Sequence, residues 1–323
     1  MSRMLVSLAL AMLMPLAVAH AQEYPARPIT IVVPVSAGGP TDAIARTLAE
    51  RMGSALGQPV VVENVTGAAG IIGVGRVQRA APDGYTIGIG LTSTHVFNGA
   101  IYKLPFDLVT DFAPISMVAT NPQLIVSRNG VPAKNLSELI GWLKANPNRA
   151  TMATIGPGSP AHIAGVLFQK ITGTSFQFVP YRGGAPGMRD MLAGQIDLMI
   201  PQPSLALPQL KAGNIRAYAV TSNERLPSAP EIPTVDEAGA PGLHIAIWHG
   251  LWAPKGTPGD IIAKLNAAVR TALADPAVRR RFADMGQEIP ALNEQTPEGL
   301  AALQKAEIAK WWPVIKAAGI ETQ

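Results

Sequence analysis

The chain has 323 residues, no cysteine, a hydrophobic fraction of 48% and a charged fraction of only 15%. This composition is typical of compact globular proteins and excludes a disordered chain, and the absence of cysteine excludes disulfides and thiol chemistry. The formal net charge is +4, and the one basic cluster, Arg279-Arg280-Arg281, is best explained as the solvated face of a predicted helix. We therefore expect no nucleic-acid partner, and the length favours two domains.

Residues 1–21 are predicted to be a secretory signal peptide. Arg3 supplies the positive end, and residues 5–18 form an apolar stretch too short to favour a membrane span. Ala19-His20-Ala21 matches an A-x-A cleavage site, so cleavage is expected after Ala21. Export of a chain without disulfides indicates the bacterial periplasm, where a large core makes such crosslinks unnecessary.

Two glycines separate the next predicted strand from the helix that follows it. Residues 29–35 are rich in β-branched side chains, which is typical of a buried strand, and Pro40 suits the first position of a helix. Gly38 and Gly39 allow backbone N–H groups to converge at the positive end of the helix dipole. The stretch predicts an anion site, although an ordinary tight turn of an α/β protein explains it equally well.

Strands then alternate with helices, which predicts parallel βαβ units and an α/β fold. In such sheets ligands bind beyond the carboxyl ends of the strands, where this chain carries small and polar residues. These residues are Thr92, Ser93, Thr94 and His95 after one strand, and Gly158 and Ser159 after another. Hydroxyl and imidazole groups suit a carboxylate ligand, but the same groups could simply cap their loops.

The chain is predicted to cross between two domains twice. The first crossing falls near residues 118–121, and a strand at 245–254 returns to the first domain. The predicted domains are therefore residues 22–119 plus 247–323, and residues 120–246. Two crossings permit hinge closure on a ligand. Residues 227–242 are rich in proline and glycine and are predicted to be a surface excursion.

Several short motifs follow one another in order along the predicted mature chain. They include Pro34-x-x-Ala37-Gly38-Gly39-x-x-Asp42-x-x-x-Arg46, Gly67-Ala68-Ala69-Gly70-x-x-Gly73, Pro82-Asp83-Gly84-Tyr85-Thr86, Gly156-x-Gly158-Ser159-x-x-His162 and Val179-Pro180-Tyr181-Arg182-Gly183. No single motif is decisive, but the series as a whole resembles the Bug-type receptors, which are the TctC-like extracytoplasmic solute-binding subunits of tripartite tricarboxylate transporters.

This resemblance implies a two-domain Venus-flytrap fold of the type II-like periplasmic binding proteins, with mixed sheets and an interdomain cleft. It also implies a small carboxylate ligand, which could be a di- or tricarboxylate, an acidic amino acid or an aromatic acid. The expected partners are this ligand and the two subunits of a membrane permease, and the expected oligomeric state is a monomer. A sensory receptor that docks on a membrane histidine kinase remains an alternative.

The resemblance places the ligand on the first strand–helix loop and on loops of the second domain. The candidate ligand-binding residues are Ser36, Ala37, Gly38, Gly39, Thr41, Thr92, Ser93, Thr94, His95, Gly158, Ser159, Tyr181 and Gln202. Asp42 is interpreted differently, because a bare carboxylate facing an anionic ligand would repel it. We expect it to cap the helix or to hydrogen-bond the loop. Val35 stands where the family often has Phe, which leaves the ligand open.

An enzyme is the less favoured reading of the same residues. Ser159 and His162 could suggest a hydrolase, but the residue after Ser159 is Pro160, so the G-x-S-x-G pattern is missing and no N–H is available there for an oxyanion hole. The sequence contains no H-E-x-x-H motif and no carboxylate cluster. We therefore predict no catalytic residue, no metal site and no cofactor.

Overall fold

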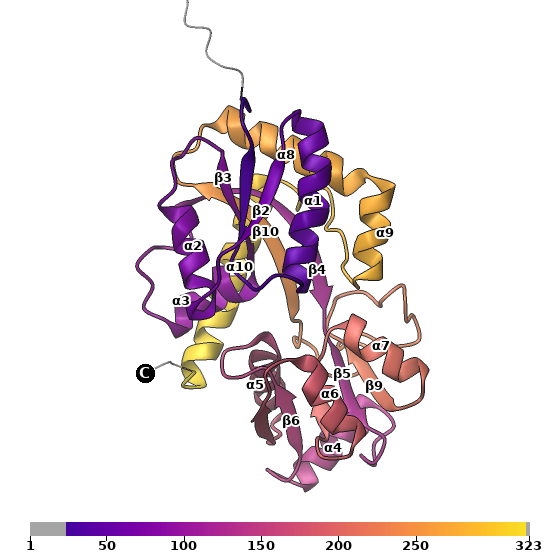
Figure 1. Cartoon of the computed structure of the whole chain (residues 1–323). Coiled ribbons are helices and arrows are strands. Elements are labelled where there is room, and N and C mark those ends of the chain that lie inside the picture. Colours follow the sequence, from indigo (N-terminus) through magenta and orange to yellow (C-terminus); the bar gives the residue numbers. More distant parts are fainter. Residues whose placement is uncertain (1–23, 321–323) are drawn as a thin grey trace, which may run out of the picture.

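The computed structural model describes residues 24–320, so the predicted signal peptide and its cleavage site lie outside the described residues. Figure 1 shows two lobes, each built around one of two five-stranded sheets. We call them the first and the second lobe, in the order in which the chain enters them. In the described part of the chain, no helix combines the length and the apolar character needed to cross a membrane.

The sheet of the first lobe has the strand order β2-β1-β3-β10-β4. β1 lies parallel to β2 and β3, whereas β10 lies antiparallel to β3 and β4, so the sheet is mixed as predicted. Its strands are β1 (Ile29–Val33), β2 (Val60–Asn64), β3 (Thr86–Leu91), β4 (Phe112–Pro122) and β10 (Ala246–Pro254).

Helices cover this sheet, and α1 shows how the sequence positions them. Ile44, Leu48 and Met52 recur every four residues and are fully buried, which gives α1 an apolar stripe toward the sheet and α8. The helices of the first lobe are α1 (Pro40–Leu56), α2 (Ile71–Gln78), α3 (Asn98–Ile101), α8 (Gly259–Ala274), α9 (Pro276–Asp284) and α10 (Pro297–Ala317), with short helical turns at Ala68–Gly70 and Ser93–Phe97.

The sheet of the second lobe has the order β7-β6-β8-β5-β9 and is also mixed. β6 is parallel to β7 and β8, and β5 is antiparallel to β8 and β9. The elements are β5 (Leu124–Arg128), α4 (Leu136–Ala145), β6 (Thr151–Thr154), α5 (Pro160–Thr172), β7 (Gln177–Pro180), α6 (Gly184–Leu192), β8 (Leu198–Met199), α7 (Pro203–Lys211) and β9 (Ile215–Val220).

Two neighbouring segments carry the chain between the lobes. β4 ends at Pro122 and β5 begins at Leu124, with only Gln123 between them, while the return segment leads from β9 into β10. The segments are bonded to each other, since Gln123 N donates to Thr221 Oγ1 over 2.8 Å and Thr221 N donates to Gln123 O over 2.9 Å. The predicted domain boundaries fall close to these crossings and stay a prediction.

The second lobe corrects one expectation. Residues 227–242 were expected to run over the surface, but Ile232 and Val235 within them are 4% and 0% exposed. Val235 N donates to Val220 O over 2.9 Å, which attaches the segment to the edge of β9. The prolines and glycines do make turns, but the apolar residues between them pack into the core, so the expectation was wrong for that part.

A pair of glycines creates a slot in the first sheet. Gly90 of β3 and Gly250 of β10 lie directly opposite each other. The ring of His95 stacks on Trp252 beside them, with 3.9 Å between the ring centroids. A β-carbon on Gly90 would lie 2.8 Å from the Trp252 ring and closer still to the His95 ring. The two glycines therefore make room for this buried pair of rings.

Candidate functional site

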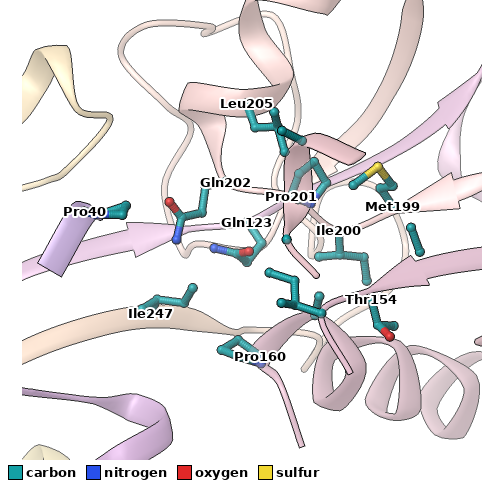
Figure 2. Close-up of a pocket in the computed structure, with 16 residues that line it drawn as sticks. Pro40, Gln123, Thr154, Pro160, Met199, Ile200, Pro201, Gln202, Leu205 and Ile247 are labelled. Carbon is teal, nitrogen blue, oxygen red and sulfur yellow. The ribbon is translucent and has the colours of Figure 1, made fainter. Parts of the chain in front are cut away.

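A cavity of about 480 Å³ lies between the two lobes, which is a usual size for a small-molecule site. The first lobe contributes Pro40 and Ile247, and the second lobe and the crossing segment contribute the rest (Figure 2). The full lining is Pro40, Gln123, Ala153, Thr154, Ile155, Pro160, Ala161, Gly183, Gly184, Ala185, Met199, Ile200, Pro201, Gln202, Leu205 and Ile247.

Four helices begin at the wall of this cavity. Pro40 is the first residue of α1, Pro160 of α5 and Gly184 of α6, while Gln202 is the N-cap of α7. No side chain caps the N-terminus of α1, α6 or α7. Helix N-termini carry unpaired N–H groups and the positive end of the dipole, so their convergence favours an anionic group in the cavity.

The lining offers few polar side chains and no ionic partner. None of the described residues that line the cavity has a charged side chain. Gln123, Thr154 and Gln202 supply two amides and one hydroxyl, and Figure 2 shows both glutamines pointing toward Pro40. An anion here would be stabilised by dipoles and hydrogen-bond donors, without a salt bridge.

The loop before α1 is held by a hydrogen bond to a side chain of α1. Ser36, Ala37 and Gly38 are exposed at the carboxyl end of β1, and Gly38 has a φ of +82°. Gly38 N donates to Asp42 Oδ2 over 2.9 Å, which occupies one of the N–H groups predicted for the ligand. The interpretation that Asp42 hydrogen-bonds this loop is confirmed. Asp42 does not cap the helix, because the N-cap is Gly39 and has no side-chain cap.

Asp42 is the centre of a hydrogen-bond network. Besides Gly38 N, it accepts from Arg46 Nε and Asn64 Nδ2, each over 3.0 Å. The Arg46 guanidinium, followed by the Gly38 and Asn64 donors, lowers the pKa of Asp42 to about 2. The carboxylate is therefore ionised at any physiological pH and fixes the loop that leads into α1.

Asp42→Asn is expected to lower the free energy of unfolding by about 2 kcal/mol at pH 7, because hydrogen bonds to a charged group are lost. A lowered pKa means that the stabilisation is present above the unfolded pKa near 3.8 and is lost as the pH falls toward about 2. Urea unfolding of both proteins between pH 2 and 7 tests this. Asp260→Asn, in the first turn of α8, is the matched control and should cost less than about 1 kcal/mol. A difference in unfolding free energy between Asp42→Asn and the unmodified protein that does not change with pH would contradict the stabilising role of the Asp42 carboxylate.

Thr41 is turned away from the cavity. It is 6% exposed, and its hydroxyl is hydrogen-bonded to His249 Nε2 over 3.1 Å. Burial lowers the pKa of His249 to about 4, so the imidazole is neutral at neutral pH. This bond joins the first turn of α1 to β10. Thr41 thus positions the helix whose Pro40 reaches the cavity.

Thr92, Thr94 and His95 are placed in the interior. They are at most 3% exposed, and the expected polar loop is a buried π-helical turn over Ser93–Phe97. Thr92 Oγ1 accepts from Trp248 N over 2.9 Å, and Thr94 Oγ1 is hydrogen-bonded to the His95 ring over 3.0 Å. Burial lowers the pKa of His95 to about 3. Neither these residues nor Ser93 line the cavity, and the hydroxyls of Thr92 and Thr94 are used for bonds within the fold.

The second lobe brings its predicted residues to the edge of the cavity. Gln202 lines it, and Ser159 lies next to Pro160 and accepts from His162 N over 3.3 Å as the N-cap of α5. Gly158 approaches the other lobe, since a β-carbon there would lie 2.7 Å from Ile101 Cδ1.

Tyr181 stands two residues before Gly183, which lines the cavity, but its hydroxyl is already engaged. It donates to Asp190 Oδ2 over 2.7 Å. Burial and then the Asp190 carboxylate raise the pKa of Tyr181 to about 12. The phenol is therefore neutral, and its hydrogen bond joins the segment before α6 to the last turn of that helix.

Several lining residues were not among the predicted ones. Gln123 lies in the crossing segment, Thr154 is the last residue of β6, and Ile155 follows it directly before the predicted glycine turn. Ile247 lies in β10. A rule that takes the last residues of each strand together with the following turn would have found Thr154 and Ile155. Within residues 24–320, no group of three or more His, Cys, Asp or Glu side chains is placed to bind a metal ion.

The two mixed sheets, the double crossing and the uncharged cavity between the lobes define a two-lobed solute-binding receptor. Residues 44–320 match the family described as "Tripartite tricarboxylate transporter family receptor". The chain belongs to this family of TctC or Bug receptors, which are periplasmic binding proteins and not enzymes.

Three solved structures are similar to this chain. The periplasmic binding protein BugD is 41% identical, with a TM-score of 0.76 and coverage of 93% of this chain and 100% of BugD. MatC from Rhodopseudomonas palustris, described with bound malate, is 38% identical, with a TM-score of 0.77 and coverage of 90% and 100%. Rpa4515 of R. palustris, described with adipate, is 34% identical, with a TM-score of 0.79 and coverage of 93% and 100%.

Proposed function

We propose that this protein captures a small carboxylate, most simply a dicarboxylate, in the cavity between its lobes and delivers it to the membrane permease of a tripartite tricarboxylate transporter. The convergence of four helix N-termini on a cavity without charged side chains is the observation that supports this function. The malate- and adipate-bound relatives support the ligand class, and the family supports the permease partner.

In this proposal each lobe is a domain, with residues 22–119 plus 247–323 in one and 120–246 in the other. The ligand binds first at the N-terminus of α1, and closure about the crossing segments adds the N-termini of α5, α6 and α7. The two lobes already touch where Gly158 meets Ile101. Closure is favoured only because the ligand binds the closed form more tightly, and the permease then recognises that form.

The mature protein starts after Ala21 in this proposal and acts in the periplasm as a monomer. The ligand contacts that we assign come from the helix N-termini, Thr154 and Gln202, and Ser36, Ala37 and Gly39 beside the N-terminus of α1 join them on closure. Gln123 and Ser159 lie at the cavity, but their side chains are hydrogen-bonded within the protein. Thr41, Thr92, Thr94, His95 and Tyr181 act as positioning residues, because their polar groups have partners inside the protein.

A thermal-shift screen with pairs of carboxylates and their neutral amides tests the function. A carboxylate present at about 100 times its Kd should stabilise the protein by roughly 2.7 kcal/mol. Succinate and adipate serve as test ligands, and succinamide and adipamide serve as controls of the same shape without charge. We expect stabilisation by acids only. Equal stabilisation by the amides, or none by any carboxylate, would contradict the proposal.

A further inference from the structure

The two amides of the lining lie on one side of the cavity, and most of the remaining wall is apolar. In Figure 2 the amides of Gln123 and Gln202 point toward Pro40, whereas Met199 and Ile200 lie on the side away from it. A carboxylate is matched by the side near Pro40, where α1 begins and the Gln202 amide points. The hydrocarbon body of a ligand would face the apolar side chains of the second lobe, and a second carboxylate would be matched by the helix N-termini of that lobe.

Ile155 belongs to the apolar part of the lining. Its side chain is 53% exposed, although it lines a cavity and directly follows the buried strand β6. Leu205 and Met199 line the same cavity. A large exposed apolar side chain inside a cleft is stabilised when an apolar surface covers it. Each methylene buried against such a wall is expected to raise affinity roughly fourfold.

Polar substituents on the ligand body would find few partners. No carboxylate lies among the described residues that line the cavity, so an ammonium group would be buried unpaired. The side-chain nitrogen of Gln123 is engaged by Asn121 O and Pro122 O, over 3.3 and 3.2 Å. A ligand hydroxyl would also lose its hydrogen bonds to water, and among the described lining residues only the side chains of Thr154, Gln123 and Gln202 could replace them.

We propose that the receptor selects carboxylates with an unsubstituted hydrocarbon body, such as straight-chain dicarboxylates, and rejects hydroxylated and amino dicarboxylates, with Ile155 as the main specificity-determining residue. This inference rests on the proposed function. It separates this chain from the relative that is described with malate, a hydroxylated acid, and places it with the relative that is described with adipate.

Titration calorimetry of the mature protein with matched ligands tests the selectivity. Adipate should bind roughly 15-fold more tightly than succinate, because two more methylenes are buried. Succinate should bind at least tenfold more tightly than malate, and adipate at least a hundredfold more tightly than 2-aminoadipate. Each of the last two pairs differs by one polar group only.

The variant Ile155→Thr tests the role of Ile155 in ligand selectivity. It removes part of the apolar wall and adds a hydroxyl, so we expect adipate affinity to fall about fivefold and the preference for succinate over malate to narrow or disappear. Ile171→Thr is the matched control, because Ile171 is also exposed (37%), lies on α5 and does not line the cavity. It should leave every affinity unchanged.

The outcomes distinguish failure of this inference from failure of the proposed function on which it rests. Malate binding as tightly as succinate, 2-aminoadipate binding as tightly as adipate, or unchanged selectivity in Ile155→Thr would overturn the inference and leave a carboxylate receptor. Failure of every carboxylate to bind a folded protein that carries no co-purified ligand would overturn both.

Discussion

Replacing Gln202 with glutamate is expected to weaken carboxylate binding by about a hundredfold while the fold stays intact. Gln202 lines the cavity and is the N-cap of α7, so the new carboxylate would lie near the ligand. Two unit charges 4 Å apart repel each other by about 1 kcal/mol in water and about 4 kcal/mol at an effective dielectric constant of 20. At a half-buried site the repulsion energy lies between these two values. A negative charge at a helix N-terminus should not destabilise α7.

Titration calorimetry at several pH values checks this prediction. Affinity in Gln202→Glu should recover as the pH falls toward the pKa of the new glutamate, because protonation removes the repulsion. Gln209→Glu is the control on the same helix. Gln209 lies outside the lining, and a glutamate there can still accept the hydrogen bond from Asn214 Nδ2. Equal affinities for Gln202→Glu and the unmodified protein would place the ligand elsewhere.

Gly90→Ala is expected to lower the free energy of unfolding by about 3 kcal/mol. The added β-carbon would lie 2.8 Å from the Trp252 ring and closer to the His95 ring, and both rings are buried. Buried rings that stack 3.9 Å apart beside the glycine pair cannot move aside without disturbing the core. The midpoint of urea unfolding measures the loss.

Gly141→Ala is the matched control. Gly141 is exposed within α4, and no atom lies within 4 Å of a β-carbon placed there. The substitution should stabilise the protein by about 0.5 to 1 kcal/mol, because alanine is the better helix residue. Adding His95→Ala to Gly90→Ala should cost less than the sum of the two single changes, since the small side chain relieves the clash. If the free-energy losses of the two single variants simply add in the double variant, a clash with the His95 ring does not explain why residue 90 is glycine.

The class of fold could be predicted because its signals are local and repeated. The β-branched run at Ile29–Val33, the two glycines after it and Pro40 specify a strand, a turn and a helix within a few residues. The same pattern recurs before α5. The order of the motifs then identified the family.

The site was predicted less well because a cavity is formed by residues that are distant in sequence. Polar residues after β3 were expected to face the ligand, but the chain there turns into the interior and Thr92, Thr94 and His95 satisfy one another and β10. A hydroxyl looks the same in sequence whether it binds a ligand or a backbone N–H. The apolar lining carried no signal, since Ile155 and Ile247 look like core residues.

The order of strands in the first sheet has a consequence for how the protein acquires its structure. β10 joins β3 to β4, and its residue His249 pairs with Leu91. The whole of the second sheet, from Leu124 to Val220, is made of chain that lies between these partners. Contacts between distant segments form slowly, because a long loop must be closed first. We therefore expect the second sheet to form before the first one is complete, and the cavity, which needs Pro40 and Ile247, to appear last during refolding.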